Sequence, residues 1–188
     1  ALKALHSRGS NIMVTSQALR SLGKVDGDAA LALARKDLAR PGGHNNQRWR
    51  YAFEVVGEHG DAKDIDRMDR FRGPEVFHWT RSAALRASAK LANKQPVGKE
   101  RDAAREKVSE DAEASLADLN LRGVQGAVGV LGSVGDLDSV KKLQAARSAC
   151  TVGVVRDAMT RAIESIRTRK EKDPKDTEKD GALTAQVK

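Results

Sequence analysis

The stretch "GVQGAVGVLGSVGD", residues 123–136, decides the fold of this 188-residue chain. Glycine stands at every third position, a density that is typical of phosphate-binding loops, collagen or flexible linkers. The same chain contains a counterpart. Residues 48–61, "RWRYAFEVVGEHGD", align with it without a gap, and both stretches end in Gly-x-x-Gly-Asp. The glycine-rich stretch is therefore one copy of a repeated unit.

Both copies carry the apolar stripe of an amphipathic helix. Their apolar residues follow the spacing i, i+3, i+4, i+7, which places them on one helix face. These residues are Trp49, Ala52, Phe53 and Val56 in the first copy and Val124, Ala127, Val128 and Leu131 in the second. The glycines at 123, 126 and 129 fall off this stripe. They are predicted to lie inside a helix, at a cost of up to about 1 kcal/mol each relative to alanine.

The end of each copy is predicted to be a turn. Gly132 and Gly135 are expected to stop the helix in the left-handed conformation that favours glycine. Asp136 is expected to cap the next helix by accepting backbone N–H groups. A phosphate-binding loop is excluded because the glycine spacing is three throughout and no Lys-Ser/Thr follows. Collagen is excluded because the stretch contains no proline.

The same stripe recurs along the whole chain. Its anchor residues lie 34 to 40 positions apart, and they are Leu22, Val56, Leu91, Leu131 and Ile166. A period of this length with two helices per unit is typical of an α-solenoid. We therefore predict an all-α fold, a HEAT/armadillo-like superhelix of about four to five helix pairs, with no strand. Each unit is read as helix A, a Gly/Asp turn and helix B.

The second helices of the units are predicted at 28–40, 61–72, 98–112 and 136–149, with a final helix at 151–170. Their inner faces are expected to carry Leu31, Ile65, Val108, Val140 and Leu143. The repeat domain is predicted to span residues 1–168. Residues 169–188 are predicted to form a charged, disordered tail because they contain too little apolar surface to fold. Loops are expected at 40–47 and 93–98.

Composition limits the classes of partner. The net charge of +8 indicates an acidic partner such as nucleic acid. The basic residues, however, alternate with acidic ones, as in "DAKDIDRMDRFR", and this pattern is typical of solvated helix faces. No apolar run is long enough to cross a membrane, so we expect a soluble chain, and its compartment is not predicted. The chain begins as if in the middle of a helix, so we expect it to be a piece of a longer polypeptide.

The residues that carry chemistry are sparse and scattered. The four histidines lie in separate segments, and neither His-Glu-x-x-His nor Cys-x-x-Cys occurs. The single cysteine, Cys150, is expected to be a small buried residue. "RWRYAF" (48–53) suggests either a nucleic-acid stacking surface or a core stripe, and its helical spacing favours the core. No catalytic, cofactor-binding or metal-binding residue is predicted in this chain.

Three phrases carry a resemblance to known repeat proteins: "QALRSLGKVDGDAALALARKDL", "RSAALRASAKLA" and "GVLGSVGDLDSVKKL". They resemble HEAT-like repeats. Their order resembles the C-terminal helical domain of bacterial zinc aminopeptidases related to aminopeptidase N. That resemblance would cover residues 1–168 and implies that the zinc and the catalytic residues of the parent metallopeptidase lie in an upstream domain. No catalytic residue is carried over to this chain.

Two functions follow as hypotheses. The first is a non-catalytic scaffold that packs on the catalytic domain of a zinc aminopeptidase and limits access to its cleft. The alternative is a free-standing HEAT-like solenoid that binds another protein or, less favoured, nucleic acid. Because second helices commonly line the concave face of a solenoid, the candidate partner-binding residues are basic side chains of those helices. They are Lys63, Arg67, Arg70, Lys141, Lys142 and Arg147.

Overall fold

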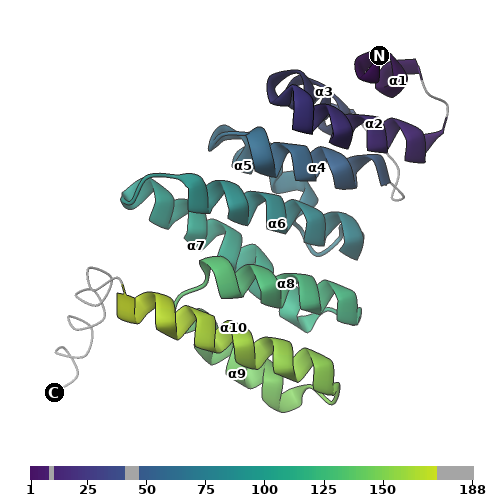
Figure 1. Cartoon of the computed structure of the whole chain (residues 1–188). Coiled ribbons are helices and arrows are strands. Elements are labelled where there is room, and N and C mark those ends of the chain that lie inside the picture. Colours follow the sequence, from purple (N-terminus) through teal and green to yellow (C-terminus); the bar gives the residue numbers. More distant parts are fainter. Residues whose placement is uncertain (9–10, 41–46, 173–188) are drawn as a thin grey trace, which may run out of the picture.

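The computed structural model describes residues 1–8, 11–40 and 47–172, and these form a stack of helices in two rows (Figure 1). A short helix, α1 (Leu2–Arg8), comes first. The A row consists of α2 (Ile12–Val25), α4 (Gln47–His59), α6 (His78–Lys94), α8 (Leu121–Val134) and α10 (Gly153–Lys172). The B row consists of α3 (Gly27–Ala39), α5 (Lys63–Arg67) with η1 (Asp69–Phe71), α7 (Lys99–Ala114) with η2 (Ser115–Ala117), and α9 (Leu137–Ala149). The all-α, HEAT-like solenoid is confirmed.

The predicted helix positions agree with the structure to within two or three residues, except in the second unit. There the expected helix over 61–72 is divided into α5, only five residues long, and the 3-10 turn η1. Asp69 and Arg70 lie in that turn. The predicted loop at 93–98 begins after Lys94, where α6 ends. Most of the loop predicted at 40–47 lies outside the described residues.

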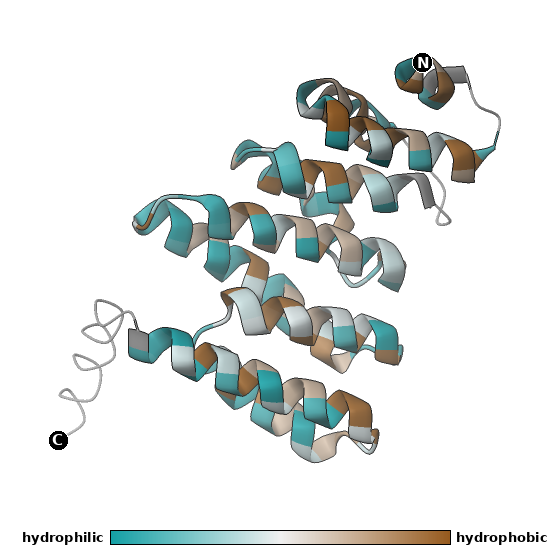
Figure 2. Cartoon of the chain, viewed as in Figure 1, coloured by the Kyte–Doolittle hydropathy of each residue, from teal (hydrophilic) through white to brown (hydrophobic). Residues whose placement is uncertain are grey.

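The core lies where the two rows meet, and in Figure 2 hydrophobic residues recur along the helices of both rows. All eight apolar residues of the two aligned copies are buried, as are the five predicted for the second helices. Trp49 and Phe53 both pack edge-on against Phe71, with ring centroids 4.9 and 5.2 Å apart. The Trp49 ring N–H donates to the carbonyl of Asp37 at 3.3 Å. "RWRYAF" therefore supplies the core, as its helical spacing predicts.

Glycine allows neighbouring helices of the A row to approach closely. A Cβ atom on Gly57 would lie 3.2 Å from Cα of Ala87, and one on Gly132 would lie 3.4 Å from Cα of Ala162. These are equivalent contacts in the two aligned copies. A Cβ atom on Gly126 would lie 2.8 Å from Cβ of Ser82 on α6. Gly126 and Gly132 of the opening stretch thus serve helix packing.

The prediction of left-handed caps at Gly132 and Gly135 is wrong. Gly132 lies inside α8, and Gly135 follows it with φ −61°. Among the described residues, only Gly98 has a positive φ. Glycine is needed at position 135 because there is no room for a side chain. A Cβ atom there would lie 2.6 Å from the carbonyl oxygen of Leu131. The cap predicted at Asp136 is confirmed, since its side chain accepts from the Ser139 N–H at 2.9 Å.

Two substitutions test the role of close packing in the A row. Gly57→Leu should lower the free energy of unfolding by about 1–3 kcal/mol, because the new side chain forces α4 away from α6. Gly129→Ala is the matched control. It meets nothing within 4 Å and should raise stability by up to about 1 kcal/mol. Urea unfolding measures both, and equal effects of the two variants would contradict this account.

Buried or half-buried arginines tie successive units together. The Arg72 side chain is fully buried and donates to Asp111 (2.6 Å), Asp69 (2.7 Å), Ser88 (3.2 Å) and the carbonyl of Ile65 (2.6 Å). Arg81 pairs with Asp118 and donates to the carbonyl of Pro74 at 2.8 Å. Arg72 thus joins α6, which carries Ser88, to α7, which carries Asp111, while Arg81 joins α6 to the loop before it and to the loop before α8, so the arginines fix the spacing of the units.

Asp64 forms a similar link and makes stability dependent on pH. Burial would raise its pKa. Hydrogen bonds from Arg35, from the Asp61 backbone and from Arg67 outweigh burial and hold the pKa of Asp64 below its ordinary value. Because this pKa is lowered, the ionised Asp64 carboxylate stabilises the fold above about pH 4. That stability is lost as the pH falls through the pKa of Asp64 in the folded state.

Asp64→Asn should therefore be less stable than the wild type at neutral pH. The difference between the two should shrink progressively below about pH 4, because there the wild-type carboxylate also becomes neutral. Urea unfolding at a series of pH values checks this. A difference that stays constant down to pH 2 would show that the charge of Asp64 does not contribute.

The predicted boundary between repeat domain and tail, at 168/169, falls inside α10. The helix continues to Lys172, and Arg169 donates to the carbonyls of Gly132 and Ser133, each at 2.9 Å. Arg169 thereby supplies hydrogen-bond donors to carbonyl groups at the C-terminal end of α8, which lack partners within the helix. Residues 173–188, which make up most of the predicted disordered tail, lie outside the described residues.

Candidate binding surface

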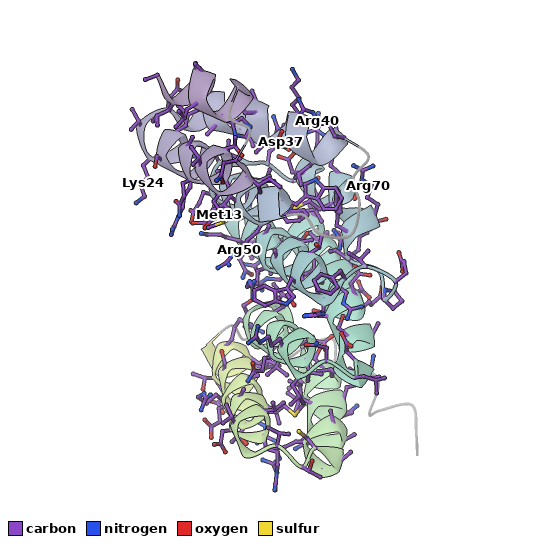
Figure 3. The ribbon with its side chains drawn as sticks, turned by 90° about the vertical axis from the view of Figure 1, so that its right-hand side faces the viewer. Met13, Lys24, Asp37, Arg40, Arg50 and Arg70 are labelled. Carbon is purple, nitrogen blue, oxygen red and sulfur yellow. The ribbon has the colours of Figure 1, made fainter. Side chains whose placement is uncertain are left out.

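Seen from the side, the array bows, and the A row lies along its hollow side (Figure 3). The second helices were expected to line the concave face, but they lie along the outer side. No helix within the described ranges has the length and hydrophobicity needed to cross a membrane.

The six basic residues predicted to bind a partner lie on the B row in two separate groups. On α5 and η1, Lys63 is exposed, Arg67 pairs with Asp64 at 2.7 Å, and Arg70 donates to the carbonyl of Leu38. On α9, Lys141 pairs with Asp138, Lys142 pairs with Glu113, and Arg147 donates to the Thr160 hydroxyl at 3.2 Å. Five of the six therefore have partners within the chain, and their role in binding stays a prediction.

The A row presents a different basic surface, built from one arginine on each of three successive helices. Arg50 lies on α4, Arg86 on α6 and Arg122 on α8, and all three are exposed. None has a carboxylate within salt-bridge distance in the described part of the chain. By contrast, Arg20 of the same row pairs with Glu54 at 3.0 Å, and Lys90 pairs with Glu58.

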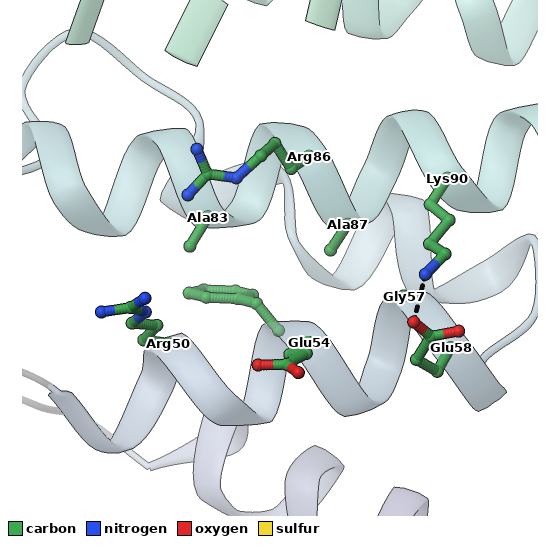
Figure 4. Close-up of a pocket in the computed structure, with 9 residues that line it drawn as sticks. Arg50, Glu54, Gly57, Glu58, Ala83, Arg86, Ala87 and Lys90 are labelled. Atoms are coloured by element: carbon green, nitrogen blue, oxygen red, sulfur yellow. Dashed lines mark hydrogen bonds and ion pairs between the residues drawn. The ribbon is translucent and has the colours of Figure 1, made fainter. Parts of the chain in front are cut away.

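Between α4 and α6 lies an open groove of about 440 Å³, shown in Figure 4. Phe53, Ala83 and Ala87 are among the residues that line it. Glu58 pairs with Lys90 across the groove, and the hydrogen bond from Lys90 lowers the pKa of Glu58. This part of the surface is therefore nearly balanced in charge.

A second, smaller pocket of about 280 Å³ lies between α6 and α8, and we call it the arginine pocket. All three arginines line it and no carboxylate does. The remaining lining residues are His78, Trp79, Ser82, Gln125 and Gly126. Trp79 is 47% exposed, and the Arg122 guanidinium carbon lies 5.0 Å from its ring centroid.

The electrostatics of the arginine pocket favour an anion. Although Arg86 is exposed, neighbouring protein atoms shield its guanidinium partly from water, and this desolvation, together with the positive charge of Arg50, lowers the pKa of Arg86. His78 is the first residue of α6, and Arg122 is the second residue of α8. The positive ends of both helices therefore border the pocket. Like charges near one another in this way are unfavourable unless an anion lies between them.

Sequence reasoning missed this surface, although a signal for it exists. The segments that form α6 and α8 contain five basic residues and no aspartate or glutamate. The five are Arg81, Arg86, Lys90, Lys94 and Arg122. Two successive first helices without acidic residues predict a positive face on the A row. The charge alternation seen in the second helices does not extend to them.

The other chemistry-bearing residues take part in packing. His6 is buried, with Nδ1 2.9 Å from the carbonyl of Thr15 and Nε2 3.0 Å from the Asp37 carboxylate. Cys150 is half-buried near the end of α9. Across residues 1–8, 11–40 and 47–172, no three His, Cys, Asp or Glu side chains cluster to hold a metal ion.

Comparison with known proteins identifies a similar fold. No family model matches the chain, and no curated protein sequence matches it. A chain in the structure of the complex of CpcE and CpcF of phycocyanin lyase from Nostoc sp. PCC7120 is similar, with a TM-score of 0.68 and 16% identity. The match covers 86% of this chain and 97% of that one.

This finding corrects the resemblance drawn from the sequence. The HEAT-like part is right, but the similar structure is a phycocyanin lyase protein and not the C-terminal domain of an aminopeptidase. The repeat phrases describe the buried stripes that any such solenoid needs, so they do not distinguish one parent protein from another. The chain is a HEAT-like solenoid whose fold is shared with a lyase protein that occurs in a two-protein complex.

Proposed function

We propose that this chain is a protein-binding solenoid and that the A row, along the hollow side, receives the partner. The observation that carries the proposal is the set of three exposed arginines without a carboxylate partner, on α4, α6 and α8. A solenoid turns its hollow side into an extended binding surface. The similar chain comes from a complex of two proteins, which also supports a protein partner.

The charges favour an acidic protein over nucleic acid. Nucleic-acid binding draws on many phosphate contacts and on stacked aromatic side chains. On the A row, Glu54 and Glu58 lie beside the arginines and would repel a continuous phosphate backbone. Stacking would need several exposed aromatic side chains, whereas the arginine pocket offers Trp79. A protein can place a few acidic groups opposite the three arginines and leave the two glutamates in their pairs with Arg20 and Lys90.

Affinity capture from an extract of the source cells tests this function. The wild-type chain is compared with two triple variants, R50E/R86E/R122E on the A row and K36E/K63E/K141E on the B row. Each extract is run with and without nuclease, and captured proteins are identified by mass spectrometry. The two variants change the net charge equally, so they separate the effect of position from the effect of charge.

We expect one or more proteins that are captured by the wild type and the B-row variant, withstand nuclease, and are lost with the A-row variant. Loss with the B-row variant alone would overturn the proposal in favour of the sequence-based prediction for Lys63 and Lys141. Capture that disappears with nuclease would point to nucleic acid instead.

A further inference from the structure

The arginine pocket has a more specific chemistry than a general basic surface. Three arginines line it, and they come from three different helices, α4, α6 and α8. The pocket is also lined by the polar residues Ser82, Gln125 and His78. A side chain at position 126 would collide with Ser82, because a Cβ there would lie 2.4 Å from its hydroxyl oxygen. Glycine at 126 thus leaves room beside the Ser82 hydroxyl.

We propose that the arginine pocket is a binding site for a phosphate monoester. A phosphate monoester carries a charge of about −1.5 to −2 at neutral pH and presents three terminal oxygens. Three guanidiniums arriving from three helices match three oxygens better than they match the two coplanar oxygens of a carboxylate. The helix N-termini that border the pocket also favour phosphate.

The carbon part of the ligand is expected to lie against Trp79. Trp79 is 47% exposed, and Arg122 covers its ring from one side. A planar or apolar group attached to the phosphate would gain contact area there. Such a ligand is either a phosphorylated side chain of the partner or a free phosphorylated small molecule. Only the first source rests on the proposed function.

Calorimetric titration of the full chain with phenyl phosphate, in low-salt buffer free of phosphate and sulfate, tests the site. Phenylacetate, with the same ring and a carboxylate, is the matched ligand. Arg50→Gln, Arg86→Gln and Arg122→Gln remove one guanidinium each. Arg20→Gln is the matched control, because Arg20 lies on the same row but is paired with Glu54.

We expect saturable one-to-one binding of phenyl phosphate and binding of phenylacetate that is at least about tenfold weaker. Each of the three pocket variants should weaken phenyl phosphate binding by about tenfold or more, because each loses a charged hydrogen bond. Arg20→Gln should leave the affinity within about twofold. Arg86→Gln should melt at or above the wild-type temperature, since it relieves repulsion with Arg50, so a loss of binding there is not unfolding.

Three results would overturn the phosphate site: no saturable binding, equal binding of phenylacetate, or unchanged affinity in Arg86→Gln. Partner capture that still depends on the three arginines would then leave the proposed protein-binding function standing. Phenyl phosphate binding without any captured partner would instead leave the site standing and remove the proposed function. A phosphorylated peptide that binds more tightly than phenyl phosphate identifies the partner as the source.

Discussion

Replacing Arg72 with alanine should lower the free energy of unfolding by about 3–5 kcal/mol. The Arg72 side chain is fully buried, and its guanidinium holds Asp69, Asp111, Ser88 and the Ile65 carbonyl together. Truncation to alanine leaves a cavity and removes the hydrogen-bond donor of these four groups. Because native domains are stable by only about 5–15 kcal/mol, this single change should bring the middle of the array close to unfolding.

Urea unfolding followed by circular dichroism measures the loss. Lys107→Ala is the matched control, because Lys107 pairs with the same Asp69, at 3.2 Å, but its side chain is 42% exposed. An exposed pair contributes up to about 1 kcal/mol, so the control should stay close to the wild type. If both variants lost the same free energy, burial of Arg72 would not be what stabilises the junction between the units.

The second large effect concerns binding. Once a partner is identified, R50E/R86E/R122E should raise its dissociation constant by about 100-fold or more. This corresponds to a loss of about 2.8 kcal/mol of binding free energy. Three attractive contacts become repulsive, and an acidic surface is then steered away from the A row. The wild-type affinity should fall with added salt.

Biolayer interferometry at several salt concentrations measures these constants. K36E/K63E/K141E should stay within about threefold of the wild type, since its three lysines lie on the B row. A larger loss in this control than in the A-row variant would place the partner on the outer side of the array.

Much of the fold could be predicted because the apolar residues that pack between the helices recur at a regular local spacing. The stripe through Trp49, Ala52, Phe53 and Val56 is buried, and so is its counterpart from Val124 to Leu131. The 3.6-residue period of a helix is enough to identify such stripes. The break between α5 and η1 could not be predicted, because Arg72, the residue after η1, also bonds Ser88 and Asp111, which lie on helices further along the sequence.

The glycines show the limit of local reasoning. Gly132 was expected to end a helix, but its position is set by the approach of Ala162, thirty residues further along the chain. The arginine pocket is a similar case. Arg50, Arg86 and Arg122 lie on separate helices, and only the stacking of the A row brings them to one pocket. The absence of acidic residues from two successive helices was the one readable signal.

The central claim is that the partner lies on the A row, and site-specific photo-crosslinking tests it most directly. A benzophenone amino acid replaces Gln125, an exposed residue of the arginine pocket, or Glu110, an exposed residue of α7 on the B row. Each chain is irradiated with its partner, and crosslinked products are sized and sequenced. We predict a crosslink from position 125 and none from position 110. A crosslink from position 110 alone would contradict the account.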